Sequence, residues 1–287
     1  MRVALLGVGL MGSAAAERLA STGFDVVVWN RTREKAERLS EALGVDIAKT
    51  PMDAVSNSDA AIAFLADDEA LLGVAGSIGR VDGLIFINSS TVTPRASRLA
   101  ASYLESRGAC YIDAPVVGGP GRVREGRLIV VASGRASCID RVRELLDALS
   151  EKVIVVGGEP GQASAVKLAY NALLITSIEV LGESVLLVER NGVNKSLFKE
   201  LLQSTVFSEF AEKYFDRAVD PRGPVGFRLE LAAKDLEYAG RAAFDTKAPA
   251  PVIEAAASVY RIASVRCGEL DYAKIYAFLR DPSCKTG

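Results

Sequence analysis

A glycine-rich segment at the start of the chain constrains the fold more than any other feature. Residues 3–12 read Val-Ala-Leu-Leu-Gly-Val-Gly-Leu-Met-Gly, an apolar run followed at once by the spacing GxGxxG. In such a segment Gly7 permits a tight turn, Gly9 lets a diphosphate approach the backbone, and Gly12 lets the following helix pack close to the strand. The helix N-terminus then offers N–H groups to the anion. The segment therefore predicts a β-strand, a dinucleotide-binding turn and a helix.

Strand and helix patterns alternate over the first 160 residues. The predicted strands are Val3–Leu6, Val26–Trp29, Ala61–Leu65, Leu84–Ile87, Leu128–Val131 and Val153–Val156. Helical segments such as Ser13–Thr22 and Glu34–Leu43 separate several of them. This alternation predicts an α/β fold with a Rossmann-like, doubly wound sheet that is parallel at least through its first half.

The pattern changes after Gly161. Four helical segments follow, at 163–190, 195–219, 229–243 and 250–266, with breaks at Asn191-Gly192, Pro221–Pro224 and Pro249–Pro251. We therefore expect a dinucleotide-binding domain over residues 1–160 and an all-helical substrate and oligomerisation domain over residues 161–287. The first of these helices is strongly apolar, but Lys167, Glu179 and Glu183 favour a buried helix over a membrane span.

The composition excludes several classes of protein. The chain has no histidine, so proton transfer falls to Lys, Asp, Glu, Tyr or Cys, and the commonest metal ligand is missing. With 34 basic and 36 acidic residues, nothing favours nucleic acid or an anionic membrane as a partner. The N-terminus shows no signal peptide, and a cytoplasmic location is expected.

The four cysteines form no CxxC pair. We expect thiols in a reducing cytosol rather than a metal site, and a Cys267–Cys284 bridge stays open. Glutamine occurs only at Gln162 and Gln203, which together with the absence of histidine favours a thermophilic source.

The end of the second predicted strand bears on the choice of cofactor. It reads Trp29-Asn30-Arg31-Thr32, whereas NAD enzymes usually place Asp or Glu here to bind the ribose hydroxyls. Asn30 removes the repulsion that a carboxylate would exert on a 2′-phosphate, Arg31 supplies a fork of donors, and Thr32 adds a hydroxyl. We therefore predict NADP, although a solvated basic turn at Arg31 and Arg33 is the alternative interpretation.

A lysine in the long apolar helix has the properties of an acid/base group. Lys167 and Asn171 are four residues apart and so project from the same helix face. Burial disfavours the ammonium form and should lower the pKa of Lys167 toward a useful range. Such a lysine could accept the proton of an alcohol and return it. The alternatives are a lysine that extends to the surface or pairs with a carboxylate.

Five motifs in order make the chain resemble the β-hydroxyacid dehydrogenase family, which includes 3-hydroxyisobutyrate dehydrogenase. Besides the glycine turn, they are Asn-Ser-Ser-Thr at 88–91, Asp-Ala-Pro-Val-Val-Gly-Gly-Pro-Gly at 113–121, Gly-Gln-Ala-Ser-Ala-Val-Lys-Leu-Ala-Tyr-Asn at 161–171, and Phe227 and Leu231 followed by Lys-Asp-Leu at 234–236. The resemblance spans nearly the whole chain.

The resemblance implies roles for individual residues. Lys167 would be catalytic, and the substrate would contact Val117, Gly118, Gly119, Asn171, Phe227 and Asp235. The cofactor would contact Gly7, Gly9, Leu10, Met11, Gly12, Asn30, Arg31, Thr32, Leu65, Ala66, Thr91 and Lys234. Thr91 and Lys234 are expected at the nicotinamide half, and the backbone of Gly118 and Gly119 at the substrate carboxylate. An exposed ion pair is the alternative for Lys234 and Asp235.

The chain departs from the family pattern at three positions. Val117 replaces a serine that usually contacts the substrate carboxylate, so affinity or substrate choice is expected to differ. Ala66 stands where proline commonly follows the third-strand leucine, and Ala70 stands where the family often has asparagine. Both lie near the expected edge of the cofactor site.

Together these features predict an NADP-dependent oxidoreductase that transfers a hydride between nicotinamide and a small 3-hydroxy acid of the 3-hydroxyisobutyrate or L-serine type. The active site is expected in the cleft between the domains, at the start of the connecting helix, without a metal. An NADPH-dependent glyoxylate or succinic semialdehyde reductase and a non-catalytic dinucleotide-binding module are the alternatives. Apolar helix faces, with Leu186, Leu187 and Val188 among them, predict a homodimer or homotetramer.

Overall fold

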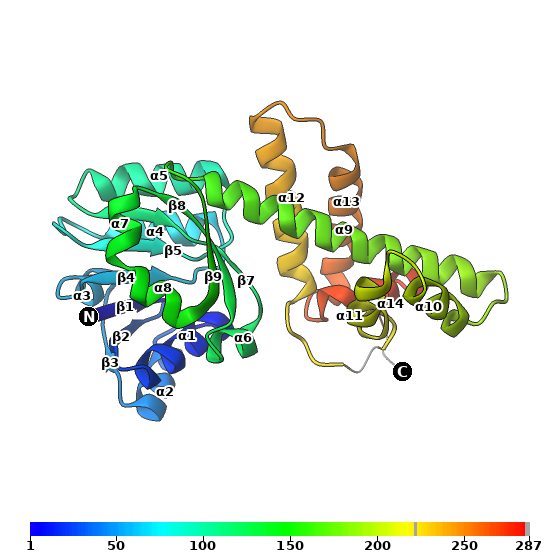
Figure 1. The fold of residues 1–287 in the computed structure, drawn as a ribbon, viewed down its shortest axis with the longest axis horizontal. Helices are drawn as coiled ribbons and strands as arrows, with labels where there is room; N and C mark the ends of the chain where they lie inside the picture. Colours follow the sequence, from blue (N-terminus) through cyan, green and yellow to red (C-terminus); the bar gives the residue numbers. More distant parts are fainter. Residues whose placement is uncertain (221–222, 285–287) are drawn as a thin grey trace. The chain divides into compact units, whose positions relative to one another are not determined.

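The computed structural model describes residues 1–220 and 223–284 (Figure 1), so Pro221 and Arg222 of one predicted break lie outside the described residues. The chain divides into two compact units, Met1–Lys167 and Leu168–Gly287. The division falls inside helix α9 (Gln162–Arg190), which begins in the first unit and continues into the second. The predicted boundary at residue 160 lies just before this helix.

The first unit contains a nine-stranded sheet with the order β3-β2-β1-β4-β5-β6-β8-β7 and β9 paired to β8. Its strands are β1 (Arg2–Leu6), β2 (Asp25–Trp29), β3 (Asp46–Ile47), β4 (Ala60–Ala63), β5 (Ile85–Asn88), β6 (Cys110–Asp113), β7 (Val116–Val117), β8 (Leu128–Gly134) and β9 (Ser150–Gly157). All pairs from β3 to β6 are parallel, whereas β8 runs antiparallel to β6 and β7. The predicted doubly wound sheet is confirmed.

Sequence analysis did not predict β3, β6 or β7. Strands β3 and β7 have two residues each, too few to show an alternating pattern. Strand β6 has four buried residues and ends in Asp113. Because charged residues are seldom fully buried, the aspartate made this segment look unlike a buried strand in the sequence.

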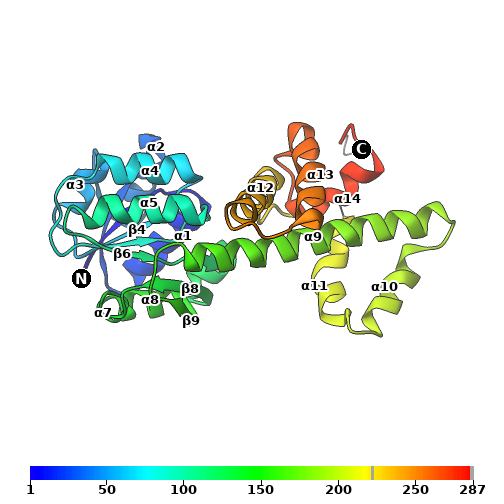
Figure 2. The same cartoon turned by 90° about the horizontal axis from the view of Figure 1, so that it is seen from above.

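Helices cover both faces of the sheet. They are α1 (Leu10–Ser21), α2 (Arg33–Leu43), α3 (Pro51–Val55), α4 (Asp68–Ser77), α5 (Pro94–Glu105), α6 (Pro120–Arg124), α7 (Ala136–Arg141) and α8 (Arg143–Leu149). Alternate residues of β1 belong to different layers: Val3 and Leu5 pack with α1, α2 and α8, and Ala4 and Leu6 pack with α3, α4 and α5. Figure 2 shows α4 and α5 on the opposite face from α7 and α8.

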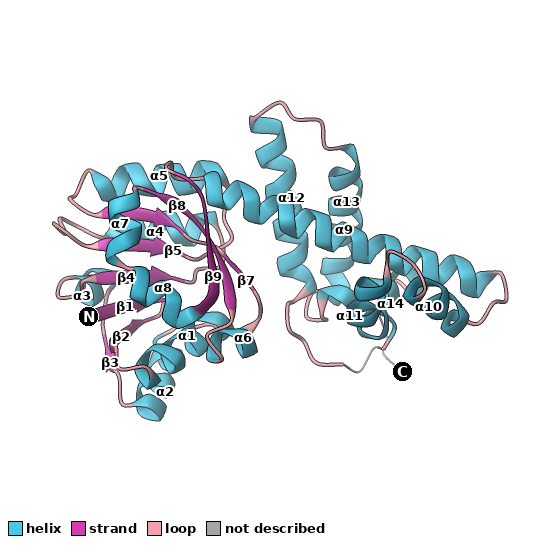
Figure 3. Cartoon of the chain, viewed as in Figure 1, coloured by secondary structure: helices cyan, strands magenta, loops and turns pink. Residues whose placement is uncertain are grey.

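The described part of the second unit is helical (Figure 3). After α9 it contains α10 (Lys195–Gln203), α11 (Ser208–Val219), α12 (Leu229–Asp245), α13 (Pro251–Cys267), a short 3-10 turn η1 (Tyr272–Lys274) and α14 (Ile275–Arg280). The predicted single helix over 195–219 is wrong, because the chain breaks after Gln203. The hydroxyls of Ser204 and Thr205 donate to the carbonyls of Glu200 and Leu202, and such local bonds compete with helix continuation.

All four cysteines are paired, so the expectation of free thiols is wrong. Cys110 in β6 is bonded to Cys138 in α7, and Cys267 at the end of α13 is bonded to Cys284. With sequence separations of 28 and 17 residues, loop closure stabilises the folded state by about 3 to 4 kcal/mol for each bridge. Disulfides are rare in the cytosol of mesophiles and frequent in intracellular proteins of hyperthermophiles.

Helix α9 is long and apolar enough to cross a bilayer by length and composition, and 44% of its most apolar window is buried inside the protein. One such helix is weak evidence for a span, since a core helix of a soluble protein passes the same test. The helix also carries a buried carboxyl group, Glu179, which is 5% exposed. Within the described residues, Glu179 Oε2 and Thr176 Oγ1 have no hydrogen-bond partner.

Burial raises the pKa of Glu179 to about 7, and the neighbouring charge of Glu183 adds to this effect. Because this pKa lies above the ordinary value of 4.5, the folded state keeps a proton that the unfolded state releases. The contribution of Glu179 to stability is therefore fully present below pH 4.5 and is lost as the pH rises to about 7.

We predict that Glu179→Gln flattens the dependence of stability on pH. Relative to wild type, its free energy of unfolding should rise by up to about 3 kcal/mol between pH 4.5 and pH 8, because the amide does not ionise. Denaturant unfolding at a series of pH values measures this difference. The exposed Glu183→Gln is the control and should keep most of the wild-type dependence. Parallel curves for wild type and Glu179→Gln would contradict the assignment.

Candidate active site

The glycine turn between β1 and α1 leaves no room for side chains at two of its three glycines. Gly7 has φ +95°, and a Cβ there would lie 2.3 Å from the carbonyl oxygen of Phe64. A Cβ at Gly12 would lie 1.9 Å from the carbonyl oxygen of Gly7. At Gly9 a Cβ would meet nothing within 4 Å. Gly7 and Gly12 thus close the turn against neighbouring backbone, and Gly9 leaves the approach to the turn open.

The start of α1 suits the diphosphate of a dinucleotide. Gly9 is the N-cap residue, so no side chain accepts from the first-turn N–H groups, and the first turn contains no acidic residue. Leu10 at this start is exposed and Met11 is half-buried. Unsatisfied N–H groups and the helix dipole both favour an anion here. The residues present therefore fit the group that the glycine spacing implies.

Asn30 ties the glycine turn to the end of β2. Its Oδ1 accepts a hydrogen bond from the N–H of Val8 at 3.0 Å, and its Nδ2 donates to the carbonyl of Thr32 at 2.8 Å. This amide is therefore engaged in holding two loops together. The hydroxyl of Thr32 makes no capping bond to α2, although Thr32 is the N-cap residue.

Two neighbouring arginines at this edge differ in their contacts. Arg33 pairs with Glu37 at 2.7 Å along α2. The side chain of Arg31 is exposed and makes no ion pair within the described part of the chain. Arg31 is thus the guanidinium at this edge that is available to a phosphate.

The loops after β4 and β5 are joined by Ser90. Its Oγ accepts from the N–H of Leu65 at 2.8 Å and donates to the carbonyl of Ala63 at 3.2 Å. Ala66 is exposed beside this junction, and Thr91 is half-buried. The predicted cofactor residues Leu65, Ala66 and Thr91 therefore lie on two loops whose backbones are held together.

Asp113 at the end of β6 is fully buried and accepts four hydrogen bonds. The donors are Asn88 Nδ2 at 3.2 Å, the N–H groups of Gly161 and Ser164 at 3.2 and 2.9 Å, and Ser164 Oγ at 3.0 Å. Burial raises the pKa of Asp113, and the hydrogen bonds from Ser164 oppose this rise. The carboxylate joins the end of a strand to the first turn of α9. Sequence analysis assigned no role to Asn88, Ser90 or Asp113, although all three lie in its motifs.

Lys167 follows Ser164 by three residues and is 8% exposed. The interpretation of Lys167 as a lysine that extends into solvent is therefore wrong. The segment after β6 contains Val117, which is half-buried, and Gly118, which has φ +135°. A Cβ at Gly118 would lie 2.8 Å from Leu128 Cδ2, whereas a Cβ at Gly119 would meet nothing within 4 Å. Lys167 and these two glycines all belong to the first unit.

In the second unit the predicted residues Asn171, Lys234 and Asp235 form one cluster. Asn171 Nδ2 donates to Asp235 Oδ2 at 2.6 Å, and Lys234 Nζ lies 2.9 Å from Asp235 Oδ1. Lys234 Nζ also lies 4.6 Å from the ring centroid of Tyr238. Asp235 is 1% exposed, so the interpretation of this pair as an exposed surface ion pair is wrong.

The loop before α12 holds Phe227 in place. The N–H groups of Gly226 and Phe227 donate to the buried carboxylate of Asp271 at 2.9 and 3.2 Å. Arg217 binds the same carboxylate through two nitrogens at 2.9 and 2.7 Å. The ring of Phe227 meets that of Tyr272 edge-on, with centroids 5.2 Å apart. Asp271 is a structural residue that sequence analysis did not identify.

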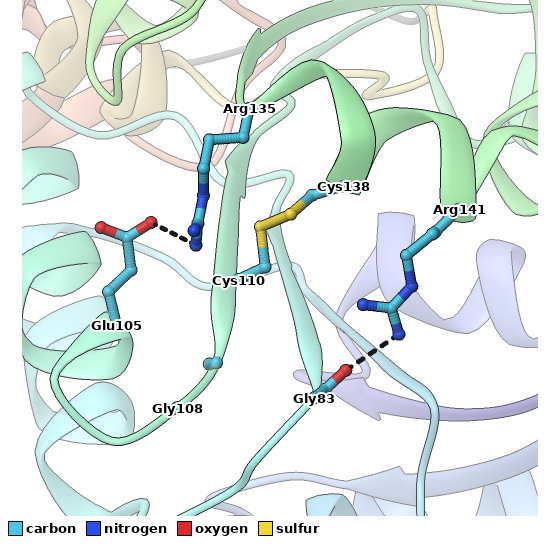
Figure 4. Close-up of a pocket in the computed structure, with 8 residues that line it drawn as sticks. Gly83, Glu105, Gly108, Cys110, Arg135, Cys138 and Arg141 are labelled. Carbon is cyan, nitrogen blue, oxygen red and sulfur yellow. Dashed lines mark hydrogen bonds and ion pairs between the residues drawn. A yellow bond between two sulfur atoms is a disulfide. The ribbon is translucent and has the colours of Figure 1, made fainter.

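A cavity of about 390 Å³ lies at the other edge of the sheet, where β5 and β6 begin. Figure 4 shows the Cys110–Cys138 bridge between the side chains of Arg135 and Arg141. Arg135 pairs with Glu105 at 3.1 Å, and Arg141 donates to the carbonyl of Gly83 at 3.1 Å. Because the glycine turn follows the end of β1, this cavity is separate from the candidate active site. The described residues contain no cluster of three or more Cys, Asp or Glu that could hold a metal.

Two family models match nearly the whole chain. The NAD binding domain of 6-phosphogluconate dehydrogenase matches residues 2–157. The family described as NAD-binding of NADP-dependent 3-hydroxyisobutyrate dehydrogenase matches residues 161–279. The two matches together cover the glycine turn, Lys167 and the Asn171–Asp235 cluster.

Similar proteins match over nearly the full chain. An uncharacterized oxidoreductase, YfjR, from Bacillus subtilis is 32% identical over 96% of this chain and 98% of its own length. Glyoxylate/succinic semialdehyde reductase 2 of Arabidopsis thaliana is 27% identical over 97% of this chain and 79% of its own length.

Among solved structures, Mycobacterium tuberculosis 3-hydroxyisobutyrate dehydrogenase with L-serine matches with a TM-score of 0.87. It is 26% identical and covers 97% of this chain and 99% of its own. Together with the family models and the geometry of the glycine turn, these matches show that the chain belongs to the β-hydroxyacid dehydrogenase family of NAD(P)-dependent oxidoreductases.

Proposed function

We propose that the protein transfers a hydride between NADP and a small 3-hydroxy acid of the 3-hydroxyisobutyrate or L-serine type, and that Lys167 transfers the proton. The observation that carries this proposal is a buried lysine one turn inside α9, in a chain that has no histidine. The likeness to an enzyme solved with L-serine supports the substrate class.

In the direction of oxidation, Lys167 Nζ accepts the hydroxyl proton of the substrate as its carbinol carbon loses a hydride. When bound, the nicotinamide would supply the redox chemistry by accepting that hydride. Backbone N–H groups of Gly118 and Gly119 bind the substrate carboxylate, where Val117 offers no hydroxyl. Asn171 donates one amide hydrogen to Asp235, which fixes its orientation, and its other polar atoms are assigned to the substrate. Phe227 supplies an apolar wall that Asp271 holds in place.

A second candidate is an NADPH-dependent reductase of glyoxylate or succinic semialdehyde. The 27% identity with the Arabidopsis reductase over 97% of the chain favours it. The same residues would act in reverse, with Lys167 donating its proton to the carbonyl oxygen. A non-catalytic dinucleotide-binding module is disfavoured by the buried Lys167.

A spectrophotometric panel at a wavelength specific for reduced nicotinamide tests the function. It follows NADP reduction with L-serine, D-threonine, 3-hydroxyisobutyrate and 3-hydroxypropionate, and NADPH oxidation with glyoxylate and succinic semialdehyde. Turnover is expected with at least one hydroxy acid, and Lys167→Ala should lower kcat by about 100- to 10,000-fold. NADPH binding by the variant, followed by fluorescence, should stay unchanged.

Lys167→Arg is the matched control, because it keeps the charge but titrates far above neutral pH and so should also lose turnover. Retained turnover in Lys167→Ala would contradict the proton-transfer role. Tight NADPH binding with no turnover of any substrate in the panel would favour the non-catalytic module.

We propose that Arg31 and Thr32 bind the 2′-phosphate of NADP. Asn30 stands where a carboxylate would repel that phosphate, and its amide is engaged in holding the two loops together. Arg31→Ala should raise the Kd for NADPH by about 10- to 100-fold and leave the Kd for NADH unchanged. Arg33→Ala is the control, because Arg33 is paired with Glu37. Equal effects of Arg31→Ala on both cofactors would refute the phosphate contact.

We also propose that the protein is a homodimer or homotetramer. Leu173, Val180 and Leu187 recur every seven residues on α9 and are 71%, 52% and 66% exposed. A stripe of this kind is costly to leave in water and is typical of a subunit contact. Light scattering should give a mass of at least twice 30.4 kDa, and Leu187→Glu should lower it. A wild-type mass of one chain at micromolar concentration would contradict the proposal.

A further inference from the structure

A buried chain of hydrogen bonds joins the ends of three neighbouring strands to α9. It begins at the loop after β4, where Ser90 Oγ contacts Leu65 and Ala63. The N–H of Ser90 donates to Asn88 Oδ1 at 3.1 Å, and Asn88 Nδ2 donates to Asp113 Oδ1 at 3.2 Å. The loops predicted to hold the cofactor are thus connected to the carboxylate that binds the start of α9.

The first turn of α9 receives its capping acceptors from distant strands. Asp113 Oδ2 accepts from the N–H groups of Gly161 and Ser164, and Ser133 Oγ in β8 accepts from the N–H of Ala163 at 3.0 Å. The residue before the helix is Gly161, which has φ +88° and no side chain that could act as a cap. A carboxylate at a helix N-terminus satisfies its N–H groups and its dipole together.

The position of this cap matters for Lys167. Ser164 and Lys167 are three residues apart, so they are neighbours on one helix face and about 4.5 Å apart along the helix axis. Any shift of the first turn therefore moves Lys167 by a similar amount. Gly161 also packs closely against the first residue of α5, since a Cβ there would lie 2.8 Å from the carbonyl oxygen of Pro94.

We propose that Asp113 is a positioning residue that, through Ser164, holds Lys167 at a fixed position relative to the loops after β4 and β5. Asn88 orients the carboxylate by donating to its Oδ1. This inference rests on the proposed role of Lys167 in proton transfer. It adds that the strand ends, and not only the helix, determine where the lysine ammonium group lies.

The amide of an asparagine replaces this carboxylate only in part. Asp113 Oδ2 accepts from two backbone N–H groups, and Oδ1 accepts from Asn88 Nδ2 and Ser164 Oγ. In Asp113→Asn the oxygen can keep the two N–H groups only if the NH2 group faces Asn88 Nδ2, a donor whose own oxygen is bound by the N–H of Ser90. The variant therefore removes the anionic cap of α9 and the contact that orients it, and a displacement of the first turn by about 1 Å costs on the order of 100-fold in rate.

The test compares Asp113→Asn with Ser164→Ala and with Thr50→Ala. The last variant removes the side-chain cap of α3, outside the network. Asp113→Asn is expected to lower kcat on the order of 100-fold and to shift the limb of the pH–rate profile that Lys167 controls, with KM and the Kd for NADPH within about twofold of wild type. Ser164→Ala, which keeps the N–H bond, should lower kcat in the same sense by a smaller factor. Thr50→Ala should change neither kcat nor the profile.

Amide hydrogen exchange gives a readout that does not depend on activity. Exchange in residues 161–167 should be at least about tenfold faster in Asp113→Asn, and unchanged in Thr50→Ala. If Asp113→Asn does not fold, Ser164→Ala provides both readouts. Wild-type kcat, pH profile and exchange in the folded variants would overturn the positioning role. Activity that survives in Lys167→Ala would instead refute the proposed proton transfer, so the two failures are distinguishable.

Discussion

The carboxylate of Asp113 is a buried anion whose neighbours must satisfy it. A charge removed from water is tolerated only when it is paired or fully hydrogen-bonded. Here four donors from β5 and from the start of α9 meet the two carboxylate oxygens. The same contacts satisfy N–H groups that the first turn of a 29-residue helix would otherwise leave open. This interaction therefore links the end of the sheet to the first turn of the helix that carries Lys167.

A second carboxylate has a comparable role in the helical unit. Asp271 is fully buried and binds Arg217 as well as the N–H groups of Gly226 and Phe227. In both units an irregular segment next to predicted site residues is held by an acidic side chain from a distant part of the chain. Such loops gain a defined position without regular secondary structure, which active-site residues require.

Glu179 is a buried carboxyl group of a different kind. Its Oε2 has no hydrogen-bond partner among the described residues, and burial raises its pKa to about 7. The protein therefore contains two kinds of buried acid. Asp113 and Asp271 accept several hydrogen bonds, whereas at Glu179 burial without a partner at Oε2 favours the protonated form. The two disulfides add a covalent constraint in each unit.

The sequence by itself determined the parallel sheet, the glycine turn and the family, because their signals are local: periodicity, glycine spacing and short motifs. Motif positions also predicted roles for Lys167, Asn171 and Asp235. Only the tertiary structure decided that Asn30 holds two loops, that the four cysteines pair, and that Asp235 is buried with Lys234 half-buried beside it. It alone brought Asp113 to Ser164, 51 residues later in the chain. The physical reason is that a hydrogen bond or a disulfide between distant residues depends on their separation in space, which no local pattern of residues encodes.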